Sequence, residues 1–288
     1  MSQKIKLKSK EDFSHIAEND ALRSECIQKL VQKPLSSQKR HNATGIPKII
    51  IQFWNDLGNV PEDVQECLDS WKPLIEQNFK RIVFDEGAAR DFIYEQFGTK
   101  NIAAFDLCHH PAMRCDYFRL CYLLKAGGFY VDADEVYQGS DLHSFFIDDH
   151  LKIQPLCYDI LSGEMIPTCI FLKQDAYSSD WIFYVNNNPI ITPPDHPIIQ
   201  LALERATSIL LSRTEKRSDI QSTTGPGNLS ACLVRHWNGL EYKGNDQDFD
   251  FLYDWDSFSI SKWPLSYRND KRNWRIWNSL IFQGKADT

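Results

Sequence analysis

The stretch Gly127-Gly128-Phe129-Tyr130-Val131-Asp132-Ala133-Asp134 says most about how this chain folds. Two glycines end a helical pattern, and three residues with high strand propensity follow them. Two carboxylates then appear, separated by one small residue, so their side chains face the same way where the backbone is extended. Carboxylate oxygens at the end of a buried strand suit Mg²⁺ or Mn²⁺, and such a cation can neutralise a leaving diphosphate. Asp132 and Asp134 are therefore the predicted metal ligands.

Upstream of this stretch, strand and helix patterns alternate. Strands are expected at 48–54, 81–84 and 129–131, and helices at 61–71, 86–97, 103–108 and 111–126. Pro61 and Pro111 stand at first-turn positions of their helices, and Gly98 follows the end of another. This order favours a mostly parallel α/β sheet with a ligand site at the carboxyl ends of its strands.

Downstream, the pattern is less regular. Strands are expected at 151–157, 168–172 and 181–185, and helices at 196–211 and 228–236. His196, between Asp195 and Pro197, is expected beside the start of its helix. The remaining C-terminal residues are aromatic and polar and predict an irregular lobe. Residues 1–45 are predicted to form an N-terminal helical extension to a single domain spanning 46–288.

Composition restricts the functional classes. The chain has 288 residues and a net charge of −7, which disfavours a nucleic acid or an anionic membrane as partner. There is no apolar run long enough to span a membrane and no apolar leader, so a cytoplasmic location without a transmembrane segment is expected. The eight cysteines include no CxxC pair and are interpreted as buried, reduced thiols.

A second candidate pair lies on the helix that leads into the strand. Asp116 and Arg119 are three residues apart, so they share one face of an otherwise apolar helix. In one interpretation they form an intrahelical salt bridge. In the other, Asp116 accepts a hydrogen bond from a sugar or ribose hydroxyl, and Arg119 donates to sugar hydroxyls or a phosphate.

Three alternatives compete with a metal-assisted site that binds a sugar and a diphosphate. Cys108-His109-His110 with Cys115 suggests zinc, but the spacing fits no standard ligand set. A strand followed by Asp-x-Asp also fits haloacid-dehalogenase-like phosphatases, with Asp132 as nucleophile and Asp134 as acid. That motif usually follows the first strand of its domain, whereas two strand–helix units precede it here. The third alternative is a non-catalytic binding module that retains the fold.

The segment from Met113 to Arg119, continued by Leu123 to Asp134, resembles the DXD sugar-binding region of glycosyltransferase family 32. That family includes fungal initiating mannosyltransferases and bacterial polysaccharide transferases, and the glucosyltransferase domains of large clostridial toxins carry a similar region. Shorter pieces are also similar. They are Ile46–Trp54 (opening strand), Asn186–Asn188 with His196-Pro197 (middle segment), and Thr224–Gly227 (late Gly-Pro loop, near the acceptor side).

The resemblance implies a GT-A-type fold, a Rossmann-like mixed sheet flanked by helices. It implies a retaining hexosyltransferase that uses a UDP- or GDP-sugar, with Mn²⁺ or Mg²⁺ as cofactor. The acceptor is expected to be a glycan, as in polysaccharide biosynthesis, or a lipid-linked or protein acceptor. The implied donor-binding residues are Trp54, which would stack on the base, Asp116, Arg119, Asp132 and Asn187; the implied catalytic set is Asp116, Arg119 and Asp134. Glu135 is expected to point away or to support the loop.

The chain departs from the family pattern near its C-terminus. Family members often carry a His or acidic metal ligand there, near a Ser-Trp pair. Here the zone reads Asn273-Trp274-Arg275-Ile276-Trp277-Asn278-Ser279-Leu280, without a histidine. Asn278 or Ser279 remain as candidate oxygen ligands, and otherwise a third protein ligand is missing.

Overall fold

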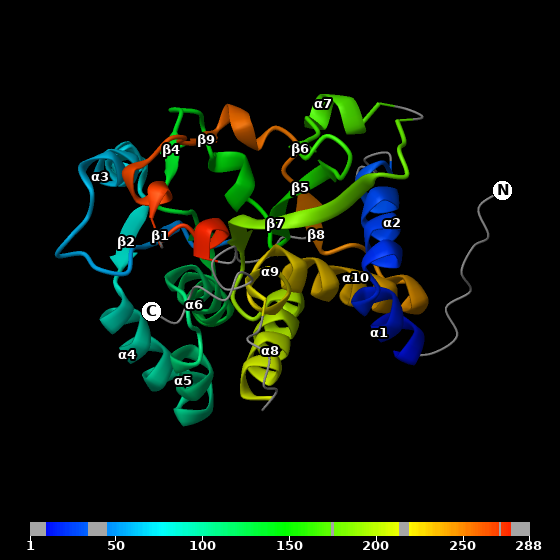
Figure 1. Ribbon diagram of the computed structural model, residues 1–288, viewed down its shortest axis with the longest axis horizontal. Coiled ribbons are helices and arrows are strands. Elements are labelled where there is room, and N and C mark those ends of the chain that lie inside the picture. The colour runs from blue at the N-terminus through cyan, green and yellow to red at the C-terminus, as the bar shows by residue number, and fades with distance from the viewer. Residues whose placement is uncertain (1–9, 34–44, 174–175, 213–218, 271, 278–288) are drawn as a thin grey trace.

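The computed structural model describes residues 10–33, 45–173, 176–212, 219–270 and 272–277. Its centre is a seven-stranded sheet in the order β2-β1-β3-β7-β5-β6, with β8 paired to β5 (Figure 1). A separate two-stranded sheet pairs β4 with β9. The strands are β1 (Ile49–Phe53), β2 (Lys80–Phe84), β3 (Gly128–Tyr130), β4 (Glu135–Tyr137), β5 (Leu151–Asp159), β6 (Glu164–Met165), β7 (Trp181–Thr192), β8 (Phe249–Phe251) and β9 (Ser259–Ser261).

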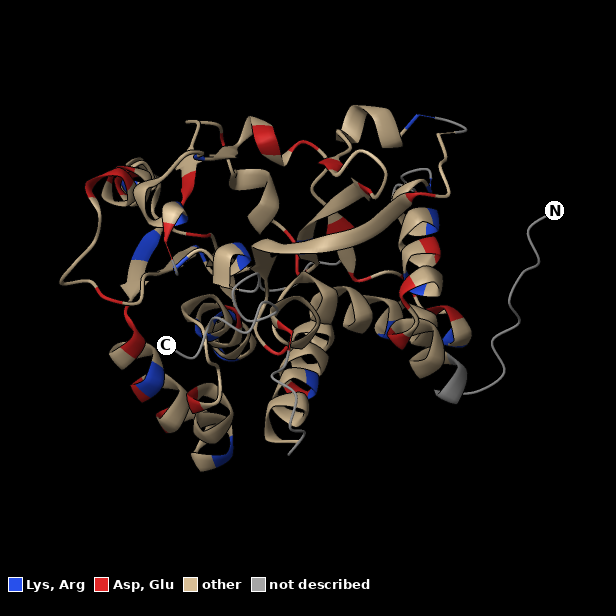
Figure 2. Ribbon diagram, in the orientation of Figure 1, with Lys and Arg blue, Asp and Glu red and all other residues tan. Residues whose placement is uncertain are grey.

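Helices flank the sheet on both sides. They are α1 (Lys10–Glu18), α2 (Asp20–Val31), α3 (Glu62–Asp69), α4 (Glu86–Phe97), α5 (Thr99–Asp106), α6 (Pro111–Ala126), α7 (Thr168–Phe171), α8 (Pro197–Leu211), α9 (Ile220–Thr223) and α10 (Pro226–Lys243). Short 3-10 turns are η1 (Lys72–Gln77), η2 (His143–Phe146), η3 (Trp255–Ser257) and η4 (Ser266–Asn269). Acidic and basic residues are interspersed along these helices (Figure 2).

The predicted α/β class, with a mixed sheet flanked by helices, is confirmed. β1 pairs in parallel with β2 and β3, as the alternating first half of the sequence indicated, whereas β7 runs antiparallel to β3 and β5. The strand predicted at 168–172 is wrong, because these residues form helix α7 after Pro167. A short apolar run cannot be assigned to strand or helix by periodicity alone. The strand expected at 181–185 extends to Thr192.

The described part of the predicted N-terminal extension is helical. Helices α1 and α2 lie against α10 and β7 (Figure 1). The backbone N–H of Phe183 donates to Ser24 Oγ at 2.9 Å, and Tyr253 Oη donates to the carbonyl of Val31 at 3.0 Å. The division of the chain at residues 45 and 46 stays a prediction.

The two glycines set the turn between α6 and β3. Gly127 has φ +63° and Gly128 has φ +109°, where an L side chain is strained. A Cβ at Gly127 would lie 2.7 Å from the backbone nitrogen of Pro194, and one at Gly128 would lie 2.8 Å from the carbonyl oxygen of Ile49. The chain therefore reverses within two residues, and β3 runs back alongside α6. This reversal brings the residues after β3 beside the middle of α6.

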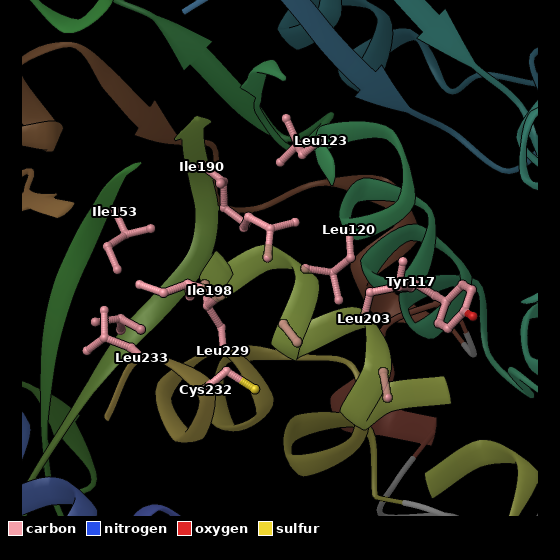
Figure 3. Close-up of a cluster of buried hydrophobic side chains, with 14 of the residues drawn as sticks. Tyr117, Leu120, Leu123, Ile153, Ile190, Ile198, Leu203, Leu229, Cys232 and Leu233 are labelled. Carbon is pink, nitrogen blue, oxygen red and sulfur yellow. The ribbon is translucent and has the colours of Figure 1, made fainter. Parts of the chain in front are cut away.

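Both faces of the sheet are buried. Adjacent residues of one strand enter different cores, so Phe129 packs with Trp71 and Trp255 while Tyr130 faces the larger cluster. Figure 3 shows part of that larger core, where side chains of α6, α8 and α10 meet those of β5 and β7. All eight cysteines are free thiols, and Cys169 is exposed, contrary to the expectation of burial.

His196 begins α8 as its N-cap. Its Nδ1 accepts from the backbone N–H of Ile198 at 3.2 Å, and its Nε2 donates to the carbonyl of Asp248 at 3.1 Å. Both bonds require the neutral ring with the proton on Nε2. Burial lowers the pKa of His196 to about 4; the charge and carbonyl of Asp248 oppose this, while His236 and His150 add to it.

Acidification is therefore expected to destabilise the fold through His196. Between about pH 6.5 and pH 4 the unfolded state binds a proton that the folded state rejects, so the free energy of unfolding falls as pH falls, by about 3 kcal/mol. Urea denaturation of the wild type and of His196→Asn measures this, because asparagine keeps the cap without titrating. The stability advantage of the wild type should shrink across this window. The exposed His15→Asn serves as control, and an advantage that is independent of pH would contradict the prediction.

Candidate active site

A cavity of about 690 Å³ lies at the carboxyl ends of β1 and β3, within the size range of small-molecule sites. Its walls come from the end of β1, helix α6, the loop after β3, strands β5 and β7, and the C-terminal segment after β9. All six predicted site residues line it: Trp54, Asp116, Arg119, Asp132, Asp134 and Asn187. Residues from four separate stretches of sequence thus meet in one cavity.

Arg119 is at the centre of the polar wall. One terminal nitrogen lies 3.0 Å from Asp116 Oδ1 and 2.8 Å from Asp132 Oδ1, and the other donates to the carbonyl of Asn187. The guanidinium also stacks over the ring of Tyr130, 4.2 Å from its centroid. The intrahelical salt bridge and the position in the pocket therefore both hold, because Arg119 pairs within α6 and across to the loop after β3.

Asp116 is oriented from two further directions. Asn187 Nδ2 donates to its Oδ1 at 2.8 Å, and Thr224 Oγ1 donates to its Oδ2 at 3.3 Å. Burial raises the pKa of Asp116 to about 6, and Asp132 adds to this while Arg119 opposes it. Burial alone would lower the pKa of Arg119, but Asp132 and its other neighbours raise it well above its usual value. Arg119 is therefore a permanent cation, and it favours the ionised form of Asp116.

The carboxylates of the motif each meet one guanidinium. Asp132 pairs with Arg119, accepts from Tyr130 Oη at 3.1 Å, and is fixed through its backbone N–H, which donates to Asn188 Oδ1 at 2.9 Å. Asp134 forms an ion pair with Arg268 and accepts from Tyr267 Oη at 2.8 Å. Burial raises the pKa of Asp134, and the charge of Asp132 adds to the shift.

The donor set fits a divalent cation that the substrate helps to hold. Among the described residues, there is no group of three or more His, Cys, Asp or Glu side chains suited to a metal. Mg²⁺ commonly takes only one or two carboxylates and completes its shell with water and phosphate oxygens, and the Asp132–Asp134 pair matches that pattern. The candidate ligands Asn278 and Ser279 lie outside the described residues. Asn273 has another role, because its Nδ2 donates to the carbonyl of Arg268 at 2.8 Å.

Two neighbours of the motif act as supports. Glu135 accepts from Ser259 Oγ and, at 3.1 Å, from Asn188 Nδ2, so of the two positions expected for it, pointing away or supporting the loop, it has the second. Burial raises its pKa to about 8. His110 caps α6, with its Nδ1 accepting from the backbone N–H of Ala112 at 3.0 Å, so this residue of the zinc alternative has a structural role.

Trp54 has two environments. It is 8% exposed and packs with Val64, Leu68 and Ala133, yet it also lines the cavity and meets the ring of Tyr267 edge-to-face at 5.3 Å. It is therefore both a core residue and a cavity wall. Base stacking by Trp54 stays a prediction.

The C-terminal segment supplies functional candidates that the sequence did not reveal. Tyr267 and Arg268 reach Asp134, and Arg275 lines the same wall. Both arginines lie over indole rings: Arg268 is 3.6 Å from the centroid of Trp263, and Arg275 is 4.5 Å from that of Trp274. In the sequence, only the alternation of Trp and Arg in this segment could have indicated these residues. That alternation has no fixed spacing.

Residues 61–152 match the family described as "Glycosyltransferase sugar-binding region containing DXD motif". The matched range contains Asp116, Arg119, Asp132 and Asp134, the residues that converge in the cavity. The match confirms, for these residues, the resemblance stated from the sequence to the DXD-containing sugar-binding region of glycosyltransferases. Membership of family 32 in particular is not confirmed.

No curated protein matches the chain. A solved structure described as "PaToxG Glycosyltransferase" is 19% identical, with a TM-score of 0.47 over 81% of this chain and 82% of its own. Another, the structure of a transferase mutant, is 11% identical, with a TM-score of 0.30 over 80% of this chain and 98% of its own. Likenesses this distant say nothing about substrate. Within the described residues, the helices are too short or too polar to cross a bilayer.

Proposed function

We propose that this chain is a metal-dependent, retaining hexosyltransferase. It would transfer a hexose from a UDP- or GDP-sugar to a hydroxyl acceptor, in the cytoplasm. The observation that carries the proposal is the convergence of Asp116, Arg119, Asp132 and Asp134 on one cavity. A nucleotide diphosphate sugar needs two kinds of group in this cavity. The sugar requires hydrogen-bond partners, and the diphosphate requires positive charge.

Asp132 and Asp134 are the residues that would hold Mn²⁺ or Mg²⁺. When bound, the cation would stabilise the negative charge that develops on the departing diphosphate. Asp116 would accept from a sugar hydroxyl, and the amide of Asn187 and the cation of Arg119 keep its carboxylate in place. Because these groups are buried and already oriented, they lose little freedom when the donor binds. No side chain is assigned as nucleophile, since retention in this fold can proceed by front-face attack of the acceptor hydroxyl.

The acceptor would enter over β5, β7 and α7. That side of the cavity is mixed in character: Leu156, Phe171 and, from β6, Met165 are apolar lining residues. A polar strip crosses it where Asn186 Nδ2 donates to Gln154 Oε1 at 3.1 Å. Asn186 directly precedes Asn187, the partner of Asp116, so an acceptor on this strip would lie next to the donor sugar. A glycan of polysaccharide biosynthesis, a lipid-linked acceptor and a protein remain the candidates.

The haloacid-dehalogenase-like alternative finds little support. The phosphatase motif usually follows the first strand of its domain, whereas Asp132 follows β3, inside the range that matches the glycosyltransferase region. The carboxylate proposed as acid, Asp134, is paired with Arg268.

A donor screen tests the proposed function. The full chain is incubated with UDP- and GDP-hexoses and Mn²⁺ or Mg²⁺, and nucleotide release is measured with glycan, lipid-linked or peptide acceptors. We expect release from at least one donor, loss of release with EDTA, and recovery when metal is restored. Hydrolysis of a phosphomonoester without turnover of any sugar nucleotide would establish the phosphatase alternative. Donor binding without turnover would establish the binding module.

A further inference from the structure

Arg268 forms an ion pair with Asp134, one of the two carboxylates that the proposed metal would bind. It comes from η4, far along the chain from the motif, and pairs with Asp134 Oδ2. Tyr267 donates to the same oxygen at 2.8 Å. The side chains of Arg268 and Asp134 are only 10% and 17% exposed, so this ion pair is largely shielded from water. A divalent cation reaching Asp134 therefore competes with a guanidinium already in contact with it.

The guanidinium of Arg268 is incompletely satisfied in this position. Its Nε is buried and has no hydrogen-bond partner among the described residues, and its contact with Ser261 Oγ is long, at 3.5 Å. An unpaired buried donor is costly, so this geometry leaves room for a better set of acceptors. The flat face of the guanidinium is supported by the ring of Trp263, 3.6 Å away, which permits rotation across the cavity wall. The Nε of Arg119 likewise has no partner in the part of the chain that the structure describes, but Arg119 is held by Asp116, Asp132 and the carbonyl of Asn187. Among the described acceptors, the guanidinium of Arg268 has only Asp134 and the long contact with Ser261, so it is the less constrained of the two and fits a group that changes partners.

The charges of the wall indicate what the second partner is. Arg268 neutralises Asp134 of the motif, and Arg119 is shared between Asp132 and Asp116. A free dication would add two positive charges and displace Arg268 next to Arg275, which lines the same wall. A diphosphate supplies the missing negative charge, and its oxygens match the fork of a guanidinium.

Resting on the proposed function, we propose that Arg268 is a resident counter-ion of Asp134 that exchanges partners when the donor binds. Asp134 would then hold the cation, and Arg268 would turn to the diphosphate of the nucleotide. The exchange breaks and forms ion pairs only, with no covalent step. A metal ion that binds without nucleotide must displace Arg268 from Asp134, and Arg268 then has no new anionic partner. A diphosphate that binds without metal meets an Arg268 that is still paired with Asp134. Metal and nucleotide therefore bind with positive coupling, which is reciprocal by linkage.

Direct binding measurements on the full chain test this exchange. Mn²⁺ affinity is measured by electron paramagnetic resonance without nucleotide and with UDP or GDP, whichever the donor screen selects. In Arg268→Gln we expect Mn²⁺ alone to bind about tenfold tighter, because the positive charge that competes for Asp134 is gone. We expect the nucleotide, with Mn²⁺ present, to bind about tenfold weaker, because its diphosphate loses one cationic partner. The control is Arg90→Gln, which removes an arginine from a half-exposed Arg–Asp pair on another part of the surface.

A second readout uses the wild type and does not depend on the folding of a variant. If Arg268 leaves the ring of Trp263, tryptophan fluorescence should change when Mn²⁺ and nucleotide are added together, and much less with either alone. Trp263→Phe should reduce that change, and the difference from the wild type isolates the contribution of Trp263 from that of Trp54, which also lines the cavity. Trp263 is 59% exposed, so this substitution is unlike a core replacement.

The outcomes separate this inference from the proposed function. Equal Mn²⁺ affinity in the wild type and Arg268→Gln, together with Mn²⁺ binding that Asp134→Asn abolishes, would overturn the exchange and leave the metal site in place. Independent, uncoupled binding of metal and nucleotide would also overturn it. Failure of every donor in the screen would remove the proposed function, and absence of both Mn²⁺ and nucleotide binding would remove both.

Discussion

Asp134→Asn will lower kcat/KM for hexose transfer by a factor of about a thousand or more, because the amide carries no charge with which to hold the cation. Asparagine has the size of the aspartate and still accepts from Tyr267 Oη, so the loop should keep its conformation. Arg268 loses its charged partner in an ion pair that is largely shielded from water, so we expect a loss of about 2–3 kcal/mol in unfolding free energy. The variant should thus fold and bind nucleotide weakly without turning it over.

Asp141→Asn is the matched control for this variant. Asp141 is an exposed aspartate that accepts from the backbone N–H of His143 at 2.8 Å and does not line the cavity. Thermal unfolding and nucleotide release are measured for both variants. If Asp134→Asn keeps wild-type activity while EDTA still inhibits it, the metal is held elsewhere. Activity that neither the substitution nor EDTA affects would refute metal dependence.

Local rules account for the part of the site that the sequence predicted. Helical periodicity places Asp116 and Arg119 on one face of α6, and Gly127-Gly128 can only be a tight reversal. Once β3 runs back along α6, Asp132 must come close to Arg119, and the ion pair at 2.8 Å follows. The alternating first half of the fold was predictable for the same reason, since the periodicity and the end signals of each strand and helix lie within its own residues.

The remainder of the site depends on contacts between residues distant in sequence. Arg268 reaches Asp134 from an aromatic lobe without regular periodicity, and Thr224 reaches Asp116 from the turn before α10. Glu135 is held by Ser259 because β4 pairs with β9, a pairing between two strands of three residues each. Propensity and spacing carry no information about such pairings, since they are decided by packing after the sheet has formed. The same limit explains the error at α7, whose apolar residues fit a strand equally well.

Arg119→Met will lower the free energy of unfolding by about 3–5 kcal/mol, more than any other single change in the polar wall. It will also abolish transfer. Methionine fills a similar volume, but it leaves Asp116 and Asp132 without their shared cation. It also removes the donor to the Asn187 carbonyl and the stacking on Tyr130. Urea denaturation measures the loss. Arg90→Met is the control, since its pair with Asp106 is half-exposed and surface ion pairs contribute little to stability.

The pH dependence of Arg119→Met distinguishes lost charge from lost packing. Burial already raises the pKa of Asp116 to about 6 with Arg119 present, and removing that cation raises it further. The folded variant then binds a proton that the unfolded chain releases, so its stability falls as pH rises. The deficit relative to wild type should therefore be largest near pH 8 and shrink toward pH 5. Adding Asp116→Asn should recover part of the stability at pH 8, because one uncompensated carboxylate is removed. A deficit that is the same at both pH values, with no recovery in the double variant, would mean that Arg119 acts through its shape, and the electrostatic account of this wall would fail.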